Sequence, residues 1–123
     1  MLNVPEYIYI KKSIKGGKGL FANTVIDKNK TIGEYTGKIL SCNTRVVSHY
    51  QFTVRKKGKC VYVIDGKYNK YGSFLKYINY ANQTKEQNCI FYQYNQRIYL
   101  KTIKRIKPGV ELLSWYGRNT YNV

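Results

Sequence analysis

Short runs of β-branched and aromatic residues alternate with turn-forming residues along nearly the whole chain. Runs of this kind, bounded by Gly, Asn, Asp and Lys, are typical of β-strands. We expect strands over residues 7–10, 19–22, 31–35, 50–55, 60–64, 89–94, 97–102 and 111–115. The pattern therefore predicts a mostly β domain.

The segments between these runs carry turn residues. Lys57-Gly58-Lys59 and Asn95-Gln96 each separate two paired runs, as hairpin turns do, and Lys107-Pro108-Gly109 forms a turn before the last strand. Only residues 73–78 have the pattern of a helix, and that helix is short. With 123 residues, the chain is long enough for one domain with one core.

No apolar run approaches the length that crosses a bilayer, and residues 1–10 lack the basic region and hydrophobic stretch of a secretion signal. We therefore expect a soluble, intracellular protein. The three cysteines, Cys42, Cys60 and Cys89, are widely spaced without a C-x-x-C pair, and His49 is the only histidine. This set predicts neither a zinc or other metal site nor a disulfide framework.

The charge is strongly unbalanced, with 22 Lys and Arg against 6 Asp and Glu and a formal net charge of +16. A field of this sign attracts polyanions. A chain rich in Lys, Asn, Ile and Tyr is also what an AT-rich genome encodes, so the charge alone leaves both interpretations open. A small basic β domain that binds nucleic acid through Lys and Tyr is one function class that fits.

Four segments in fixed order carry candidate chemistry. They are GGKGLFA at 16–22, IGEYTGK at 32–38, Asp65-Gly66 followed by FLKYINYA at 74–81, and PGVELLSWYG at 108–117. Glycine in the first segment allows a close approach of backbone to a ligand, which a side chain would block.

Together the four segments resemble the SET-domain lysine methyltransferases over residues 7–116. The sequences IDG, YINYA, EQN and LLSWYG resemble in particular the PR-type SET domains of the PRDM proteins, with Tyr80 in place of the usual histidine. Because zinc fingers and a cysteine-rich post-SET segment are missing, the arrangement is closer to the free-standing SET proteins of large DNA viruses. We expect a SET domain over residues 6–117 and a short C-terminal tail at 118–123, with the pocket closed by Tyr121 or by a second copy of the chain in a homodimer.

The resemblance implies a fold of several small twisted sheets with a C-terminal pseudoknot, which places Asn79 beside Tyr116. It also implies S-adenosylmethionine as cofactor, and the residues that would bind it are Gly17, Lys18, Gly19, Tyr50, Asn79, Tyr80 and Tyr116. The substrate lysine and its peptide would meet Tyr35, Tyr50, Gln51, Phe52 and Ser114. Tyr116 would be the central catalytic tyrosine, with Tyr35 on the opposite wall.

The implied reaction is methyl transfer to a lysine of a basic protein, by default the tail of histone H3, in the nucleus or on chromatin and with nucleosomal DNA as a further partner. Ser114 stands two residues before Tyr116, where many SET enzymes place Phe or Tyr. A small side chain there leaves room for a methylated amine, which predicts di- or trimethylation. The alternative is a catalytically weak PR-like module that binds chromatin, protein or nucleic acid.

Overall fold

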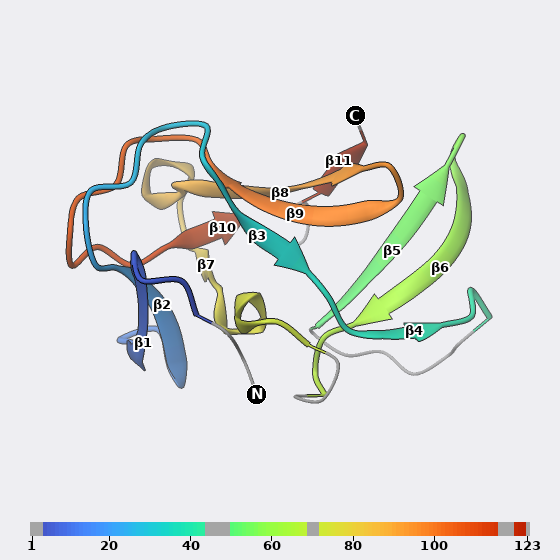
Figure 1. Cartoon of the computed structure of the whole chain (residues 1–123), viewed down its shortest axis with the longest axis horizontal. Helices are drawn as coiled ribbons and strands as arrows, with labels where there is room; N and C mark the ends of the chain where they lie inside the picture. Colours follow the sequence, from blue (N-terminus) through green and yellow to red (C-terminus); the bar gives the residue numbers. More distant parts are fainter. Residues whose placement is uncertain (1–3, 44–49, 69–71, 116–119, 123) are drawn as a thin grey trace.

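The computed structural model describes residues 4–43, 50–68, 72–115 and 120–122 of the chain (Figure 1). The strands are β1 (Ile8–Lys12), β2 (Lys18–Ala22), β3 (Thr31–Tyr35), β4 (Lys38–Leu40), β5 (Gln51–Lys56), β6 (Lys59–Asp65), β7 (Asn79–Ala81), β8 (Cys89–Tyr94), β9 (Arg97–Thr102), β10 (Leu113–Trp115) and β11 (Thr120–Asn122). Two short 3₁₀ helices complete the set, η1 (Phe74–Tyr77) and η2 (Thr84–Glu86). The predicted mostly β fold is confirmed.

The strands form four small sheets. Their orders are β11-β8-β9-β3, β4-β6-β5, β1-β2 and β10-β7. In Figure 1 the β5–β6 hairpin stands at the opposite end of the molecule from the β1–β2 hairpin, with the four-stranded sheet between them. One hydrophobic core joins the sheets, with Val54 and Ile64 from the three-stranded sheet packed in the same cluster as Phe91, Ile98 and Leu100.

Two hairpin turns form at the positions that the sequence predicts. Lys57 and Gly58 have φ angles of 52° and 79°, and Asn95 and Gln96 have φ angles of 49° and 62°. Two consecutive residues in the left-handed region are the signature of the type I′ turn, whose twist matches that of the flanking strands. Local turn chemistry therefore sets the register of both hairpins.

The helix expected over residues 73–78 is a single 3₁₀ turn, η1. The Ser73 hydroxyl oxygen accepts a hydrogen bond from the Leu75 backbone N–H at 3.2 Å, and the backbone becomes extended at Ile78, before β7. No helix in the described part of the chain is long and apolar enough to span a membrane.

The C-terminal segment returns to the middle of the chain. Strand β10 pairs in parallel with β7, so that Leu113 lies opposite Asn79. The strand expected from residue 111 begins at Leu113, because Glu111 instead makes an isolated antiparallel bridge with Phe21. Beyond it, β11 pairs in parallel with β8 and occupies part of the segment expected as a tail.

One prediction about the cysteines is wrong. Cys42 and Cys60 form a disulfide across a sequence separation of 18, with their Cα atoms 6.1 Å apart. The pairing of β4 with β6 brings Leu40 opposite Val63 and carries Cys42 toward Cys60. Spacing along the chain gave no sign of this proximity. Cys89 is a free, buried thiol, and its burial raises its pKa above the ordinary value.

Candidate active site

A cavity of about 330 Å³ gathers seven of the eleven site residues that the resemblance implies. Its lining residues are Gly16, Gly17, Lys18, Tyr35, Tyr50, Phe52, Leu75, Lys76, Tyr77, Ile78, Asn79, Tyr80 and Phe91. They come from the β1–β2 turn, the end of β3, the start of β5, the segment from η1 to β7, and β8. The fold therefore brings the first three motifs together around one space.

The glycine-rich turn forms one rim of this cavity. Gly16 and Gly17 have φ angles of 106° and 59°, a region that side chains rarely adopt. The Ser13 N–H donates to the Gly17 carbonyl at 2.8 Å, and the Gly16 N–H donates to the Ser13 carbonyl at 3.1 Å, which closes the turn. Glycine at 16 and 17 is thus required by the backbone conformation.

Gly19 is required for a different reason. It does not line the cavity, and a side chain on it would collide with the carboxylate of Glu111 and press on the amide of Asn79. Gly19, which was predicted to touch the cofactor, therefore lies instead against the Glu111 carboxylate and the Asn79 amide.

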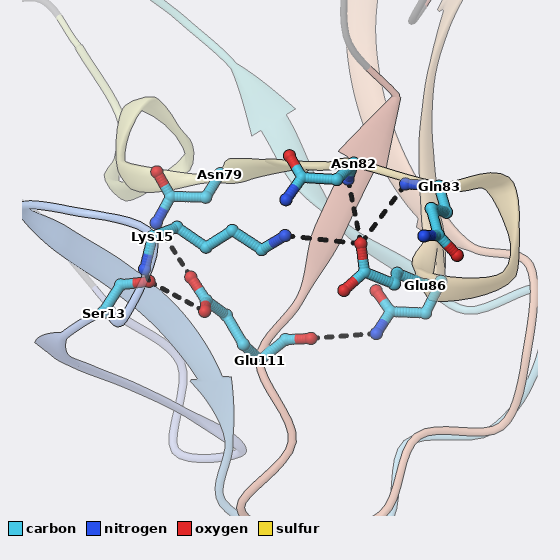
Figure 2. Close-up of polar contacts among 8 residues, drawn as sticks. Ser13, Lys15, Asn79, Asn82, Gln83, Glu86 and Glu111 are labelled. Atoms are coloured by element: carbon cyan, nitrogen blue, oxygen red, sulfur yellow. Dashed lines mark hydrogen bonds and ion pairs between the residues drawn. The ribbon is translucent and has the colours of Figure 1, made fainter.

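A polar network joins the glycine turn to Asn79 (Figure 2). The Glu111 carboxylate accepts the Ser13 hydroxyl at 2.9 Å through one oxygen and the Asn79 side-chain amide at 2.8 Å through the other. The same amide donates to the Lys18 carbonyl at 3.1 Å. Glu111 thus links the turn between β1 and β2 to the strand that carries Asn79.

Asn88 fixes the backbone on either side of this link. Its side-chain amide donates to the Glu111 carbonyl at 2.9 Å, and its side-chain oxygen accepts the Leu113 N–H at 2.8 Å. The sequence placed Glu111 only inside the fourth motif and gave Asn88 no role. One feature of the sequence could have indicated the role of Glu111. The chain has only six acidic residues, so each of them is a candidate for a contact inside the fold.

A second carboxylate anchors the other side of the turn. Glu86 accepts the Asn82 N–H at 2.9 Å and the Gln83 N–H at 3.3 Å and lies 3.4 Å from the Lys15 ammonium (Figure 2). The hydrogen bond from Asn82, followed by those from Gln83 and Lys15, lowers the pKa of Glu86. Lys15 and η2 are thereby held together at the edge of the site.

An aromatic wall closes the inner end of the cavity. Tyr35 is only 2% exposed, and its ring packs edge-on against Phe52 and Phe91 at centroid distances of 4.8 and 5.6 Å. Its hydroxyl donates to the Tyr50 carbonyl at 2.7 Å. Burial, with smaller contributions from Tyr80, Asp65 and Tyr50, raises the pKa of Tyr35 far above its ordinary value. In this geometry Tyr35 presents its ring to the cavity and uses its hydroxyl to fix the start of β5.

The remaining predicted site residues lie outside the cavity lining. Gln51 donates to the Asp65 carboxylate at 3.3 Å. Ser114 is fully buried, and its hydroxyl has no hydrogen-bond partner among the residues that the structure describes. Tyr116, predicted to be the central catalytic tyrosine, lies outside the described residues.

Tyr77 is a lining residue that the sequence reasoning missed. The Lys18 and Lys76 ammonium groups lie 5.8 and 5.3 Å from the centre of its ring. It also lines a neighbouring cavity of about 610 Å³, together with Val4, Ile10, Lys11, Lys12, Gly17 and Lys18. The only signal for Tyr77 was its place inside the third motif.

The charged groups that line the two cavities are all lysines, and none of the six acidic residues lines either one. Aromatic faces attract cations, whereas lysine ammonium groups attract carboxylates and phosphates. The site is therefore equipped for a ligand that carries a cationic centre against the aromatic wall and an anionic group at the lysine-bearing rim. In the part of the chain that the structure describes, no three His, Cys, Asp or Glu side chains converge as they would around a metal ion.

Known proteins share this arrangement of elements. The family model that matches residues 7–123 is that of the PR domain of PR domain zinc finger protein 2. The human protein named histone-lysine N-methyltransferase PRDM7 is 34% identical over 85 residues, which are 69% of this chain and 17% of that protein. Histone-lysine N-methyltransferase set-17 of Caenorhabditis elegans is 31% identical over 106 residues, which are 86% of this chain and 38% of that protein, so this chain spans less than half the length of either relative.

Solved structures agree with the family match. The methyltransferase domain of human PR domain-containing protein 2 superposes with a TM-score of 0.80 at 28% identity, covering 98% of this chain and 80% of that one. The SET domain of the RIZ1 tumor suppressor (PRDM2) gives a TM-score of 0.76 at 32% identity, covering 94% of this chain and 73% of that one. The sequence, the sheets and the comparisons together show that the chain belongs to the PR-domain family and has the SET-domain fold.

Proposed function

We propose that this chain transfers a methyl group from S-adenosylmethionine to a lysine side chain of a protein, with a histone, by default the tail of H3, as the substrate. The observation that carries the proposal is the single cavity in which the glycine turn, Asn79 and the aromatic wall meet. The relatives named histone-lysine N-methyltransferase PRDM7 and set-17 support the same reaction.

The residues present fit the cofactor. Each of the two adjoining cavities lies within the range of about 300–1,000 Å³ that is usual for small-molecule sites. At the rim, the backbone of the glycine turn allows close contact, and Lys18 and Lys76 complement a carboxylate. When bound there, S-adenosylmethionine supplies the methyl group, carried on a sulfonium.

The aromatic wall would serve the acceptor lysine. A free lysine has a pKa of about 10.4, so the nucleophilic amine must be obtained from a side chain that is mostly protonated in water. The rings of Tyr35, Phe52 and Phe91 exclude water and disfavour the charged ammonium, and their faces still attract the alkylammonium as it arrives. The protein thereby contributes alignment and desolvation.

Tyr116 is the proposed source of a hydroxyl that orients the amine. The Tyr35 hydroxyl is engaged by the Tyr50 carbonyl, so its role is that of a wall. We further propose that the protein acts on chromatin in the nucleus, a proposal supported by the histone-lysine substrate in the names of two relatives.

The test is a methylation assay with labelled S-adenosylmethionine on free histones and on nucleosomes, read by mass spectrometry of the modified lysine. We expect methyl transfer by the wild type. The rate of transfer should fall at least 10²-fold in Tyr116→Phe, because this substitution removes the hydroxyl that orients the amine and leaves the ring in place. Calorimetry of cofactor binding should give similar affinities for the two proteins.

Tyr94→Phe is the matched control, because it removes one tyrosine hydroxyl from an exposed position on β8. It should keep full activity. Wild-type activity in Tyr116→Phe would remove Tyr116 from the site. Absence of both cofactor binding and transfer in the wild type would instead favour the alternative, a PR-like module that binds chromatin, protein or nucleic acid without catalysis.

A further inference from the structure

The tip of the β5–β6 hairpin carries a dense cluster of positive charge. Residues 55–59 read Arg-Lys-Lys-Gly-Lys, and all five are exposed. Among the residues that the structure describes, none of these four basic side chains makes a hydrogen bond, ion pair or ring contact. No acidic residue lies between Gln51 and Ile64, and Asp65, at the far end of β6, is 1% exposed. We call residues 55–59 the basic tip.

Two features of the basic tip destabilise the hairpin locally. Lys56 lies directly opposite Lys59 in the ladder, and like charges in that position repel. Lys57 has a φ angle of 52°, where Asn or Gly would be favoured. The β8–β9 hairpin, by contrast, places Asn95 at the equivalent turn position with a φ angle of 49°. A segment that breaks local rules without an internal compensating contact is a candidate for a binding site.

The backbone is nevertheless held firmly at and beside the basic tip. Gln93 binds the Arg55 backbone on both sides, accepting its N–H at 2.9 Å and donating to its carbonyl. The Tyr62 hydroxyl donates to the Gln96 carbonyl, Val54 is fully buried, and Cys60 is joined to Cys42. The basic side chains therefore project from a rigid two-stranded ribbon, which stands out from the body at one end of the molecule (Figure 1).

We propose that the basic tip is a binding site for the phosphate backbone of duplex nucleic acid. Lysine and arginine side chains supply most protein contacts to phosphates, and neutralisation of the phosphates releases condensed counterions. A two-stranded β ribbon has the width that the major groove of B-DNA admits. The sign, density and exposure of the charge at the basic tip match this partner.

The position of the basic tip leaves the cavity accessible. Phe52 lines the cavity near the start of β5, five residues before Lys57 in the turn. At about 3.3 Å per residue, the two are separated by roughly 17 Å along the strand. A duplex held at the tip therefore need not cover the cavity.

The test uses the full chain and fluorescence anisotropy with labelled 20-base-pair duplexes, one of DNA and one of RNA, between 50 and 200 mM salt. The variant neutralises the tip with residues suited to strands and to the left-handed turn position: Arg55→Thr, Lys56→Thr, Lys57→Asn and Lys59→Thr. The control variant removes the same four charges, one Arg and three Lys, from exposed positions in other segments: Lys28→Gln, Lys85→Gln, Arg105→Gln and Lys107→Gln.

We expect the wild type to bind with a steep salt dependence. Each lost phosphate contact lowers by about 0.9 the steepness of the plot of log binding constant against log salt concentration. The slope for the tip variant should therefore be smaller by about 2 to 3.5, and its affinity at the lowest salt should be more than tenfold weaker. The control variant should lose less than 1 of the slope. The two duplexes separate a DNA site from a general phosphate site, and either result supports the proposal.

Equal losses in the two variants would overturn the proposal, because the charge would then act only as a general field. Absence of duplex binding by the wild type, or binding of polyglutamate of equal charge in its place, would also overturn it. The tip variant should unfold at or above the wild-type temperature, because the repulsion between Lys56 and Lys59 is removed, so weakened binding cannot be assigned to unfolding. These measurements do not depend on methyl transfer, so their outcome is distinct from that of the proposed function.

Discussion

Replacing Glu111 by Ala tests the polar link between the glycine turn and Asn79. The substitution removes the acceptor for the Ser13 hydroxyl at 2.9 Å and for the Asn79 amide at 2.8 Å. A hydrogen bond to a charged group contributes about 1.5–3 kcal/mol, and Glu111 is only partly buried, so we reduce this to about 1–2 kcal/mol for each of the two bonds. The expected loss is about 2–4 kcal/mol in the free energy of unfolding.

This free energy converts into a measurable temperature shift. Unfolding entropy of about 2.1 cal/mol/K per residue gives about 0.26 kcal/mol/K for a chain of 123 residues. Glu111→Ala should therefore lower the midpoint of thermal unfolding by about 8–15 °C. Cofactor affinity should fall at least tenfold, because Asn79 and the turn next to Gly19 lose their common support.

Glu111→Gln separates the shape of the side chain from its charge. Its amide oxygen can accept from Asn79 while its amide nitrogen donates to the Ser13 hydroxyl oxygen, so both contacts survive without the charge. The expected loss is about 1 kcal/mol, or about 4 °C. Glu6→Ala is the control, since it also removes one carboxylate. Glu6 is exposed and lines neither of the two cavities that adjoin the glycine turn. A midpoint for Glu111→Ala within 2 °C of the control, with unchanged cofactor affinity, would refute the role given to Glu111.

Two further predictions concern stability. Replacing Cys42 and Cys60 by Ser opens a loop with a sequence separation of 18, and the chain entropy released in the unfolded state corresponds to about 3 kcal/mol. The unfolding midpoint should therefore fall by about 12 °C, and dithiothreitol should lower the midpoint of the wild type by the same amount. A wild-type midpoint that does not change under reduction would contradict the disulfide. Ser114→Ala removes a buried hydroxyl that has no hydrogen-bond partner among the described residues. Thermal unfolding should therefore show an unchanged free energy of unfolding or a gain of up to about 1 kcal/mol. A large loss of stability would show that the hydroxyl has a partner. The predicted di- or trimethylation requires Ser114 to face the lysine channel, and intact-mass spectrometry of the product tests it.

The strands that the sequence predicted best are those that local chemistry determines. The bounds of β3, β8 and β9 agree with the expected ranges, because each has a clear run of β-branched or aromatic residues between turn residues. β4, β7 and β11 were missed. Each has three residues, and each exists through a partner strand remote in the sequence rather than through its own composition.

The site shows the same division between local and non-local information. The resemblance carried Gly17, Tyr35 and Asn79, and the structure places them around one cavity. It could not carry the supporting role of Glu111, since that role exists only after β10 is laid beside β7 and residue 111 reaches the glycine turn. The disulfide was missed for the same reason, because only the β4–β6 pairing brings Cys42 to Cys60.

The distribution of charge is compatible with the basic protein substrate that we propose. A chain with a net charge of +16 repels a lysine-rich tail if its field acts evenly over the surface. At physiological salt the Debye length is about 8 Å, and Lys57, at the turn of the basic tip, lies roughly 17 Å along β5 from Phe52 of the cavity, so the field of the turn is largely screened at the proposed position of the acceptor lysine. Lys18 and Lys76 do line the cavity, but an anionic ligand group at that rim neutralises their effect. Charge concentrated at the hairpin can therefore hold a polyanion without excluding the cationic side chain that the aromatic wall is suited to receive.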